Sequence, residues 1–107
     1  MGAYRFVRSL IFFDLPVEKV SQRRAYTSFV KGIKKIGFYM LQESVYVKLD
    51  IDSQASDSTK EKVNKILPAE GFIALFRITE KQFASIEFLV GEAEGEILST
   101  DNRLIEL

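Results

Sequence analysis

The sequence predicts a single α+β domain with a ferredoxin-like arrangement, in which two helices cover one face of an antiparallel sheet. Three observations predict it. The chain has 107 residues, the size of one domain. It is 47% hydrophobic, which is enough to form a core. Strand-like and helical segments follow one another in an order that we assign to β-α-β-β-α-β. We place this domain at residues 1–91 and an acidic C-terminal tail with a terminal strand at residues 92–107.

The first segments are a strand and an amphipathic helix. Residues 5–13 are rich in Phe, Val, Leu and Ile and are apolar on both faces, as in a strand that is buried on both sides. Ser21 is expected to cap a helix over residues 22–36, which Gly37 ends. The apolar residues of this helix recur at helical spacing, and they are Tyr26, Phe29, Val30, Ile33 and Ile36.

The middle of the chain predicts a strand, a loop and a shorter helix. Residues 38–49 read as a second strand, in which one face carries Leu41, Val45, Val47 and Leu49 and the other carries Phe38, Met40, Gln42, Ser44 and Tyr46. Residues 50–59 are polar and predict a loop. The helix that follows continues to about residue 67, where Pro68 and Gly71 end it. It is expected to bury Thr59, Val63, Ile66 and Leu67.

Three further segments predict strands: residues 72–78, residues 86–90 and, in the tail, residues 103–107. The helices cover only one face of the sheet, and the alternation of residues 38–49 places apolar side chains on the other face as well. An exposed apolar face of this size is typical of an interface, and face-to-face packing of two copies is the simplest cover. We therefore expect a homodimer that forms through a face containing Phe38, Met40 and Tyr46.

The composition excludes several kinds of chemistry. Without cysteine the chain forms neither disulfides nor thiolate metal sites. Without histidine it lacks the usual general base and the commonest transition-metal ligand. A bound metal would be a hard cation held by carboxylates, such as Mg²⁺. No stretch approaches the roughly 20 apolar residues of a membrane span, and no secretory segment is recognised. We therefore expect a cytoplasmic protein without membrane contact.

The net charge of zero hides an uneven distribution. Residues 1–48 carry nine basic and three acidic residues, residues 49–79 four and five, and residues 80–107 two and seven. This split predicts a basic face for an anionic partner and an acidic tail for something else, unless the two parts neutralise each other in the fold. Four basic residues share the polar side of the first helix, either as solvated charges or as a phosphate-binding stripe: Arg24, Lys31, Lys34 and Lys35.

Asp14 is the candidate for chemistry. It directly follows the first strand, and Leu15 and Pro16 give the chain a fixed exit. A carboxylate on such a rigid scaffold suits a metal or base chemistry, whereas the alternative is an aspartate that caps the turn before the helix. One carboxylate is a poor Mg²⁺ site, but a twofold dimer could bring two copies together. Ser44 and Tyr46 either carry function or pack in the dimer face.

Several motifs resemble the Cas-two family, the small CRISPR-associated proteins of spacer acquisition. Phe-Phe-Asp-Leu-Pro at residues 12–16 resembles the signature that ends the family's first strand, and residues 37–46 (GFYMLQESVY) resemble its second strand. Three later segments look like the versions found in type II systems, and they are residues 67–71 (LPAEG), 79–83 (TEKQF) and 87–91 (EFLVG). The resemblance extends from about residue 5 to residue 91, with the motifs in family order.

The resemblance implies a ferredoxin-like homodimer whose sheets face each other, with a CRISPR integrase subunit of the Cas-one family as its partner. It implies a task in CRISPR adaptation, which is to hold duplex prespacer DNA before its insertion into the repeat array. It also implies that Asp14 binds Mg²⁺ or Mn²⁺ across the dimer axis, and that members cleave single-stranded RNA or duplex DNA as metal-dependent endonucleases. The strand at residues 103–107 would cross to the other protomer and touch the integrase.

A role in holding DNA explains the uneven charge, because duplex backbone attracts arginine and lysine regardless of base sequence. The acidic tail would repel DNA, so it is expected to face a basic surface of the integrase. Three functions compete: a DNA-binding scaffold, a Mg²⁺-dependent nuclease with paired Asp14 carboxylates, and a ferredoxin-like regulatory module that binds a small molecule. The candidate phosphate contacts, chosen by charge and placement, are Arg8, Arg23, Arg24, Lys31, Lys34, Lys35 and Arg77.

Overall fold

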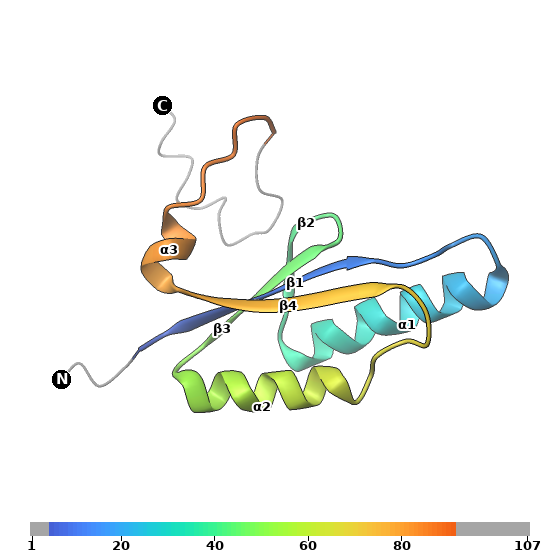
Figure 1. Cartoon of the computed structure of the whole chain (residues 1–107), viewed down its shortest axis with the longest axis horizontal. Coiled ribbons are helices and arrows are strands. Elements are labelled where there is room, and N and C mark those ends of the chain that lie inside the picture. The colour runs from blue at the N-terminus through green and yellow to red at the C-terminus, as the bar shows by residue number, and fades with distance from the viewer. Residues whose placement is uncertain (1–4, 92–107) are drawn as a thin grey trace.

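The computed structural model describes residues 5–91 of the chain. Within them the strands form one sheet in the order β2-β3-β1-β4, with every neighbouring pair antiparallel, and α1 and α2 lie along one face of it (Figure 1). The predicted α+β, ferredoxin-like fold class is confirmed. The elements are β1 (Val7–Asp14), α1 (Val20–Ile36), β2 (Tyr39–Gln42), β3 (Val45–Asp50), α2 (Ser53–Asn64), β4 (Phe72–Thr79) and the short α3 (Glu80–Ala84).

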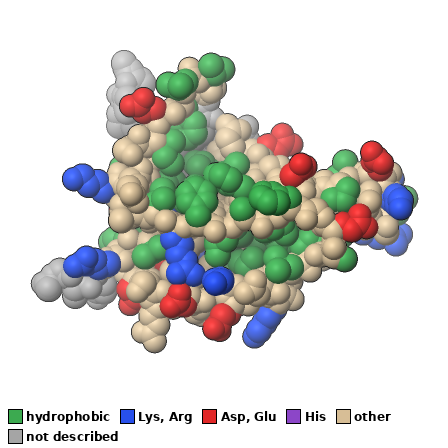
Figure 2. Space-filling view, viewed as in Figure 1, with side chains coloured by type: hydrophobic (Ala, Val, Ile, Leu, Met, Phe, Trp, Pro, Cys, Tyr) green, Lys and Arg blue, Asp and Glu red, His purple; other side chains and the backbone are tan. Residues whose placement is uncertain are grey.

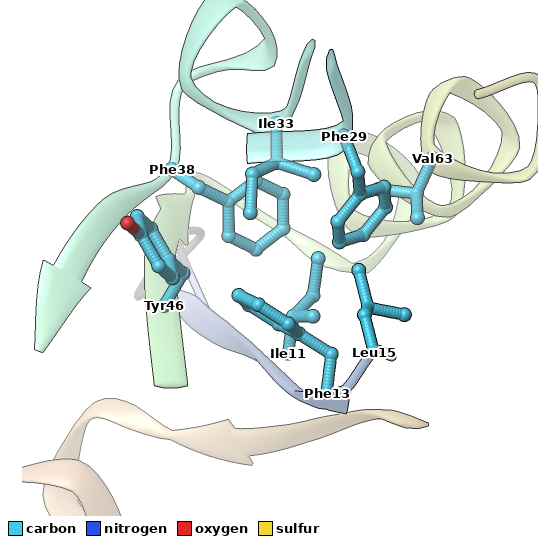
Figure 3. Packing of buried hydrophobic residues seen from close by; sticks show 8 residues of the cluster. All are labelled: Ile11, Phe13, Leu15, Phe29, Ile33, Phe38, Tyr46 and Val63. Atoms are coloured by element: carbon cyan, nitrogen blue, oxygen red, sulfur yellow. The ribbon is translucent and has the colours of Figure 1, made fainter. Parts of the chain in front are cut away.

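The main core lies between the sheet and the helices α1 and α2. β1 lies inside the sheet, between β3 and β4. Its residues Ile11 and Phe13 point toward the helices, where they meet Phe29 and Ile33 of α1 and Val63 of α2 (Figure 3). The rings of Phe13 and Phe29 pack edge to face with their centroids 5.4 Å apart. The apolar side predicted for the first helix is therefore confirmed as the side that faces the sheet.

The segment at residues 38–49, which the sequence predicts as one strand, contains two. β2 and β3 form a hairpin, and the chain reverses at Ser44, whose φ of 69° lies in the left-handed region. The Ser44 carbonyl oxygen accepts a hydrogen bond from the backbone N–H of Phe13 at 3.1 Å, which ties the turn to β1. The turn contains no Gly, Asn or Pro, the residues that mark such turns in a sequence, and alternation alone did not reveal it.

The helix α2 begins and ends earlier than the sequence predicts. Residues 50–59 are not a loop throughout, because the Asp52 side chain accepts a hydrogen bond from the N–H of Ala55 at 2.8 Å and so caps a helix that begins at residue 53. The helix ends at Asn64, before the proline. Of the residues expected to be buried here, Thr59 and Val63 are buried, Ile66 is partly buried and Leu67 is exposed.

The strand predicted at residues 86–90 is wrong, because these residues follow α3 as an irregular segment. The capping of α3 explains the difference. The Thr79 hydroxyl accepts a hydrogen bond from the N–H of Gln82 at 3.0 Å, and the Gln82 side chain accepts one from the N–H of Thr79 at 2.9 Å. The chain therefore turns into a helix directly after β4. The tail strand predicted at residues 103–107 lies outside the described residues.

The sheet face that α1 and α2 do not cover is named the open face. The sequence predicts Phe38, Met40 and Tyr46 on it, and this is wrong, because all three pack on the helix side. Alternation along a strand shows which residues share a face, but it does not show which face the helices cover. Because β1 is apolar on both faces, the polarity of its side chains does not indicate which face of the sheet the helices cover.

The open face is apolar nonetheless. At one end, Phe83 of α3 packs on Leu10 and Val47 and covers them, together with Ile86 and Phe88. Beyond this cover, side chains of β1 and β4 stay open to solvent, and Figure 2 shows hydrophobic side chains gathered in a band over the sheet. We name the exposed set the apolar patch, and its members are Phe12 (40% exposed), Phe72 (63%) and Phe76 (41%).

Arg8 joins α3 to the sheet. The residue is only 5% exposed, and its Nε and Nη2 donate to the two carboxylate oxygens of Glu80 at 2.6 and 2.9 Å. Its Nη1 donates to the Tyr39 hydroxyl at 2.6 Å, and the guanidinium lies over the Phe83 ring, 4.3 Å from the ring centroid. Arg8 therefore has almost no surface to offer a phosphate, and we assign it a structural role.

The free energy of unfolding is expected to fall on acidification partly through Glu80. The hydrogen bonds from Arg8 hold the pKa of the Glu80 carboxyl below its ordinary value of 4.5. A group whose pKa is lowered by folding stabilises the protein above its ordinary pKa, and this stability is lost as the pH falls through the folded-state pKa. The free energy of unfolding, measured by urea titration from pH 7 to pH 3, should therefore fall more for the wild type than for Glu80→Gln. The difference should stay below about 1 kcal/mol because Glu80 is 45% exposed. Parallel pH curves would contradict this role.

A buried polar network lies between the sheet and α2. Asp50, at the end of β3, is 2% exposed and accepts hydrogen bonds from the hydroxyls of Ser9 and Thr59, each at 3.0 Å. The Lys48 ammonium forms an ion pair with the same carboxylate, and the Ser56 hydroxyl lies 3.3 Å from that of Ser9. The network connects β1, β3 and α2. The sequence patterns did not predict it.

Within residues 5–91, no helix is both long enough and apolar enough to cross a membrane.

Candidate functional site

Asp14 is the last residue of β1, and its side chain lies on the open face. Alternation along the strand puts it on the same side as Leu10 and Phe12, and it pairs with Phe72 of β4. Asp14 is exposed, so its carboxylate meets solvent at the border of the apolar patch. Within the described residues no group donates a hydrogen bond to this carboxylate, which speaks against the alternative role as a turn cap.

The backbone at Asp14 packs closely against the loop between α2 and β4. Gly71 in this loop has a φ of 105°, and a Cβ built on it would lie 3.0 Å from the Asp14 carbonyl oxygen and 2.5 Å from a methyl carbon of Leu15. Leu15 is itself buried in the main core. These contacts require glycine at position 71 and hold the end of β1 in place, so the Asp14 carboxylate extends from a rigid support.

Asp14 and its surroundings in one chain supply only part of the oxygen ligands that a metal site needs. Among residues 5–91, no three Asp, Glu, His or Cys side chains lie together so that they could hold an ion. One carboxylate supplies a minority of the oxygen ligands that Mg²⁺ needs, and water commonly supplies others. Because Asp14 borders the apolar patch, two chains packed through their open faces would add a second carboxylate. The donor chemistry suits a hard cation at such a shared position.

The basic stripe predicted on the first helix lies on the exposed side of α1. The helix has 17 residues, of which five are basic and none is acidic. Its buried residues face the sheet, so the stripe points away from the open face. No side chain within residues 5–91 forms an ion pair with these cations. The exposed residues of the stripe are Arg24, Lys31, Lys34 and Lys35.

The other candidate phosphate contacts lie apart from one another. Arg23 lies beside the stripe on α1, but its Nη1 donates to the carbonyl oxygens of Val17 and Glu18, each at 2.9 Å. Arg77 is on β4 and pairs with Asp57 of α2 at 2.9 Å, on the helix side of the sheet. The Arg8–Glu80 pair links the basic first part of the chain to the acidic last part, so neutralisation within the fold accounts for a portion of the charge split. It does not account for the stripe.

Two smaller expectations are corrected by the structure. The helix α1 begins at Val20, before Ser21, because the Gln22 side chain accepts hydrogen bonds from the N–H groups of Glu18 and Lys19 and so caps the helix. Tyr46 packs in the main core on the helix side, not in the open face, and burial raises the pKa of its hydroxyl above the ordinary value of 10.0.

Comparison with known proteins shows the family to which the chain is related. The family model described as "CRISPR associated protein Cas2" matches residues 7–86, from β1 to just beyond α3. Three similar proteins carry the name "CRISPR-associated endoribonuclease Cas2". The one from Treponema denticola is 42% identical over 94% of this chain and 100% of that protein. The one from Ligilactobacillus salivarius is 35% identical over 94% and 100%, and the one from Streptococcus mutans is 37% identical over 94% and 93%. The chain belongs to the CRISPR-associated protein Cas2 family.

Proposed function

We propose that this protein is a dimeric subunit of CRISPR adaptation that holds duplex prespacer DNA, and that an integrase subunit of the Cas-one family is its partner in inserting that DNA. The observation that carries the proposal is the separation of two surfaces on opposite sides of one small domain. The apolar patch of Phe12, Phe72 and Phe76 lies on the open face, and the basic stripe lies on the outer side of α1.

The two surfaces support different contacts. An apolar patch on β1 and the edge strand β4 is suited to a second copy of the chain, because packing the two open faces removes both patches from water. Such a dimer leaves the α1 helix of each protomer on the outside. Exposed lysines and arginines without acidic neighbours attract phosphates of any base sequence, as a protein that accepts varied fragments requires.

A second function is favoured by the position of Asp14 and by the names of the relatives. In a dimer closed through the open faces, the two Asp14 carboxylates would lie in or beside the interface, where together they could hold one Mg²⁺ or Mn²⁺. A bound divalent ion would lower the pKa of a coordinated water and neutralise phosphate charge during hydrolysis. We therefore also propose a metal-dependent endonuclease activity on RNA or DNA, with Asp14 as the residue that holds the ion and orients the water.

The scaffold function is tested by the salt dependence of duplex binding. The triple variant Lys31→Gln, Lys34→Gln, Lys35→Gln removes three charges of the stripe and leaves the core of α1 intact. The slope of log affinity against log salt should become shallower by about 0.9 for each phosphate contact that is lost, which is up to about 2.7 per protomer. Fluorescence anisotropy with duplexes of two unrelated sequences measures both slopes.

The matched control has the same charge change on α2. The variant Lys60→Gln, Lys62→Gln, Lys65→Gln neutralises three exposed lysines on and just after that helix. We expect it to change the slope much less. If the wild type binds duplex DNA without salt dependence, or if both variants lose affinity equally, the stripe is not the duplex-binding surface.

A further inference from the structure

A small pocket lies next to the end of β1 that carries Asp14. Its volume is about 190 Å³, and its lining comes from the β1–α1 connection, the first turns of α1 and the loop between α2 and β4. The two connections lie at the same end of the sheet (Figure 1). The lining includes Leu15 and Pro16, which directly follow Asp14, and Glu70, which directly precedes Gly71. The pocket and the Asp14 carboxylate therefore share one rigid support.

The lining of this pocket suits a small, flat and uncharged ring. Among the described residues that form it, none is basic, so the pocket does not attract a phosphate. Its volume is below the roughly 300 Å³ at which pockets for drug-sized ligands begin, and a single nucleobase is a ligand of suitable size. Unpaired bases stack on aromatic and apolar side chains. The side chains that offer such surfaces are Leu15, Pro16, Ala25, Tyr26 and Pro68.

Glu70 gives the pocket a polar recognition group. Its Oε1 accepts a hydrogen bond from Nε2 of Gln22 at 2.9 Å, and Oε1 of Gln22 accepts the hydrogen bonds that cap α1. The Glu70 carboxylate is therefore anchored to the first turn of the helix. Within residues 5–91 no group donates to its second oxygen. A carboxylate accepts hydrogen bonds and donates none, so the matching ligand carries N–H donors.

A second hollow on the same turns of α1 has the opposite charge. It is a shallow groove of about 470 Å³, lined by Val20, Arg23, Arg24, Thr27, Ser28 and Lys31. The pocket is lined by Ser21, Gln22 and Ala25, which alternate with the groove residues along the helix. A nucleic acid strand carries uncharged bases on an anionic backbone, so a base in the pocket and phosphates along the groove match both linings. A lone cationic side chain of a protein would match the pocket only.

We propose that the pocket holds the guanine base of a single-stranded nucleic acid and that Glu70 recognises it. The Watson–Crick edge of guanine carries two adjacent N–H donors, on N1 and on the exocyclic N2, and one carboxylate accepts both. Adenine and cytosine place an acceptor nitrogen beside their amino group, and uracil has no amino group. In a duplex this edge is paired, so the pocket selects unpaired strands. The inference rests on the proposed action on nucleic acid and deepens it, because a strand held there brings a neighbouring phosphate toward Asp14.

The preference is measured with the full-length protein and three labelled RNA pentamers that differ at one base, UUGUU, UUAUU and UUUUU. EDTA is present, so that no metal-dependent cleavage occurs. The wild type should bind UUGUU about tenfold more tightly than the other two, the discrimination expected of a bidentate pair with a base. Glu70→Gln should abolish the preference, although its amide oxygen still accepts from Gln22. The control Glu61→Gln makes the same charge change at an exposed position of α2 and should keep the preference.

The place of binding is measured with free nucleosides, which carry no phosphate. Guanosine should shift the amide NMR signals of Ser21 and Glu70, and uridine should leave them unchanged. Ala25→Leu extends a larger side chain into the pocket, because Ala25 is part of its lining. This variant should lose both the guanosine shifts and the preference for UUGUU.

The outcomes separate this inference from the proposed function. If the wild type binds a duplex but binds the three pentamers equally, the guanine pocket is refuted and the proposed scaffold function stands. If UUGUU is preferred through Glu70 but no duplex is bound, the pocket stands and the scaffold function fails. If N-acetylarginine amide shifts the Ser21 and Glu70 signals and guanosine does not, the pocket takes a side chain of a protein partner and the inference is overturned.

Discussion

Replacing Asp14 with alanine should reduce metal-dependent cleavage of RNA or duplex DNA by at least about a hundredfold, which corresponds to roughly 2.7 kcal/mol of activation free energy. The reason is that the described residues contain no cluster of three or more Asp, Glu, His or Cys side chains that could hold the ion in its place, so the site depends on the Asp14 carboxylate of each protomer. The carboxylate stands at a position held rigid by Gly71 and Leu15, which makes it suited to orient a water molecule. The measurement is the cleavage rate with labelled single-stranded RNA or duplex DNA in Mg²⁺ or Mn²⁺.

The variant Asp57→Ala is the matched control for this experiment, because Asp57 is also an exposed aspartate but lies on α2, on the opposite side of the sheet. It should cleave as fast as the wild type. Both variants are first verified as folded dimers by circular dichroism and light scattering. If Asp14→Ala and the wild type cleave equally, or if neither cleaves, Asp14 is not a catalytic residue and the scaffold function alone remains.

Replacing Asp50 with alanine should lower the free energy of unfolding by about 3 kcal/mol, in line with the removal of one partner from a charge pair whose carboxylate is buried. The substitution leaves the buried hydroxyls of Ser9 and Thr59 without their acceptor and leaves the Lys48 ammonium without its counter-ion. For a domain of this size the midpoint of thermal unfolding should fall by about 12–24 °C. Urea and thermal unfolding followed by circular dichroism measure both quantities.

Two further substitutions show whether burial is the cause. Asp57→Ala also removes an ion pair, with Arg77, but Asp57 has a side chain that is 67% exposed, so the loss should stay below about 1 kcal/mol. Asp50→Asn keeps an oxygen acceptor for a hydroxyl group and should recover part of the stability lost in Asp50→Ala. Equal losses for Asp50→Ala and Asp57→Ala would show that the buried network does not stabilise the fold in this way.

The helices illustrate how far local patterns reach. The apolar residues of α1 recur at helical spacing, and this spacing alone indicated both the helix and the side that is buried, because helical geometry relates residues that are close in the chain. The cap of α2 at Asp52 and the capping pair of Thr79 and Gln82 are equally local, and a search for capping residues could have found them. The strand predicted at residues 86–90 failed because an apolar run of this length fits a strand or an irregular packed segment equally well.

Arg8, by contrast, could not be assigned from sequence. Its position in an apolar strand and its charge made it a candidate for phosphate binding, but its partner Glu80 stands 72 residues away. Asp50 presents the same difficulty, since it meets Ser9 and Thr59 only after β1, β3 and α2 have come together. For both residues the deciding contact joins segments that are distant in the chain.

The sequence by itself determined the α+β class, the buried side of α1, the exposed basic stripe, the absence of cysteine and histidine chemistry, and Asp14 at the end of a rigid strand. Each of these depends on residue type or on short-range periodicity. Only the tertiary structure decided which sheet face the helices cover and that Phe12, Phe72 and Phe76 form the open apolar patch. It also decided that Arg8 and Asp50 are buried, Arg8 with Glu80 and Asp50 with Ser9 and Thr59. The physical reason is that burial and pairing depend on which elements pack together, and β1, apolar on both sides, is compatible with helices on either face.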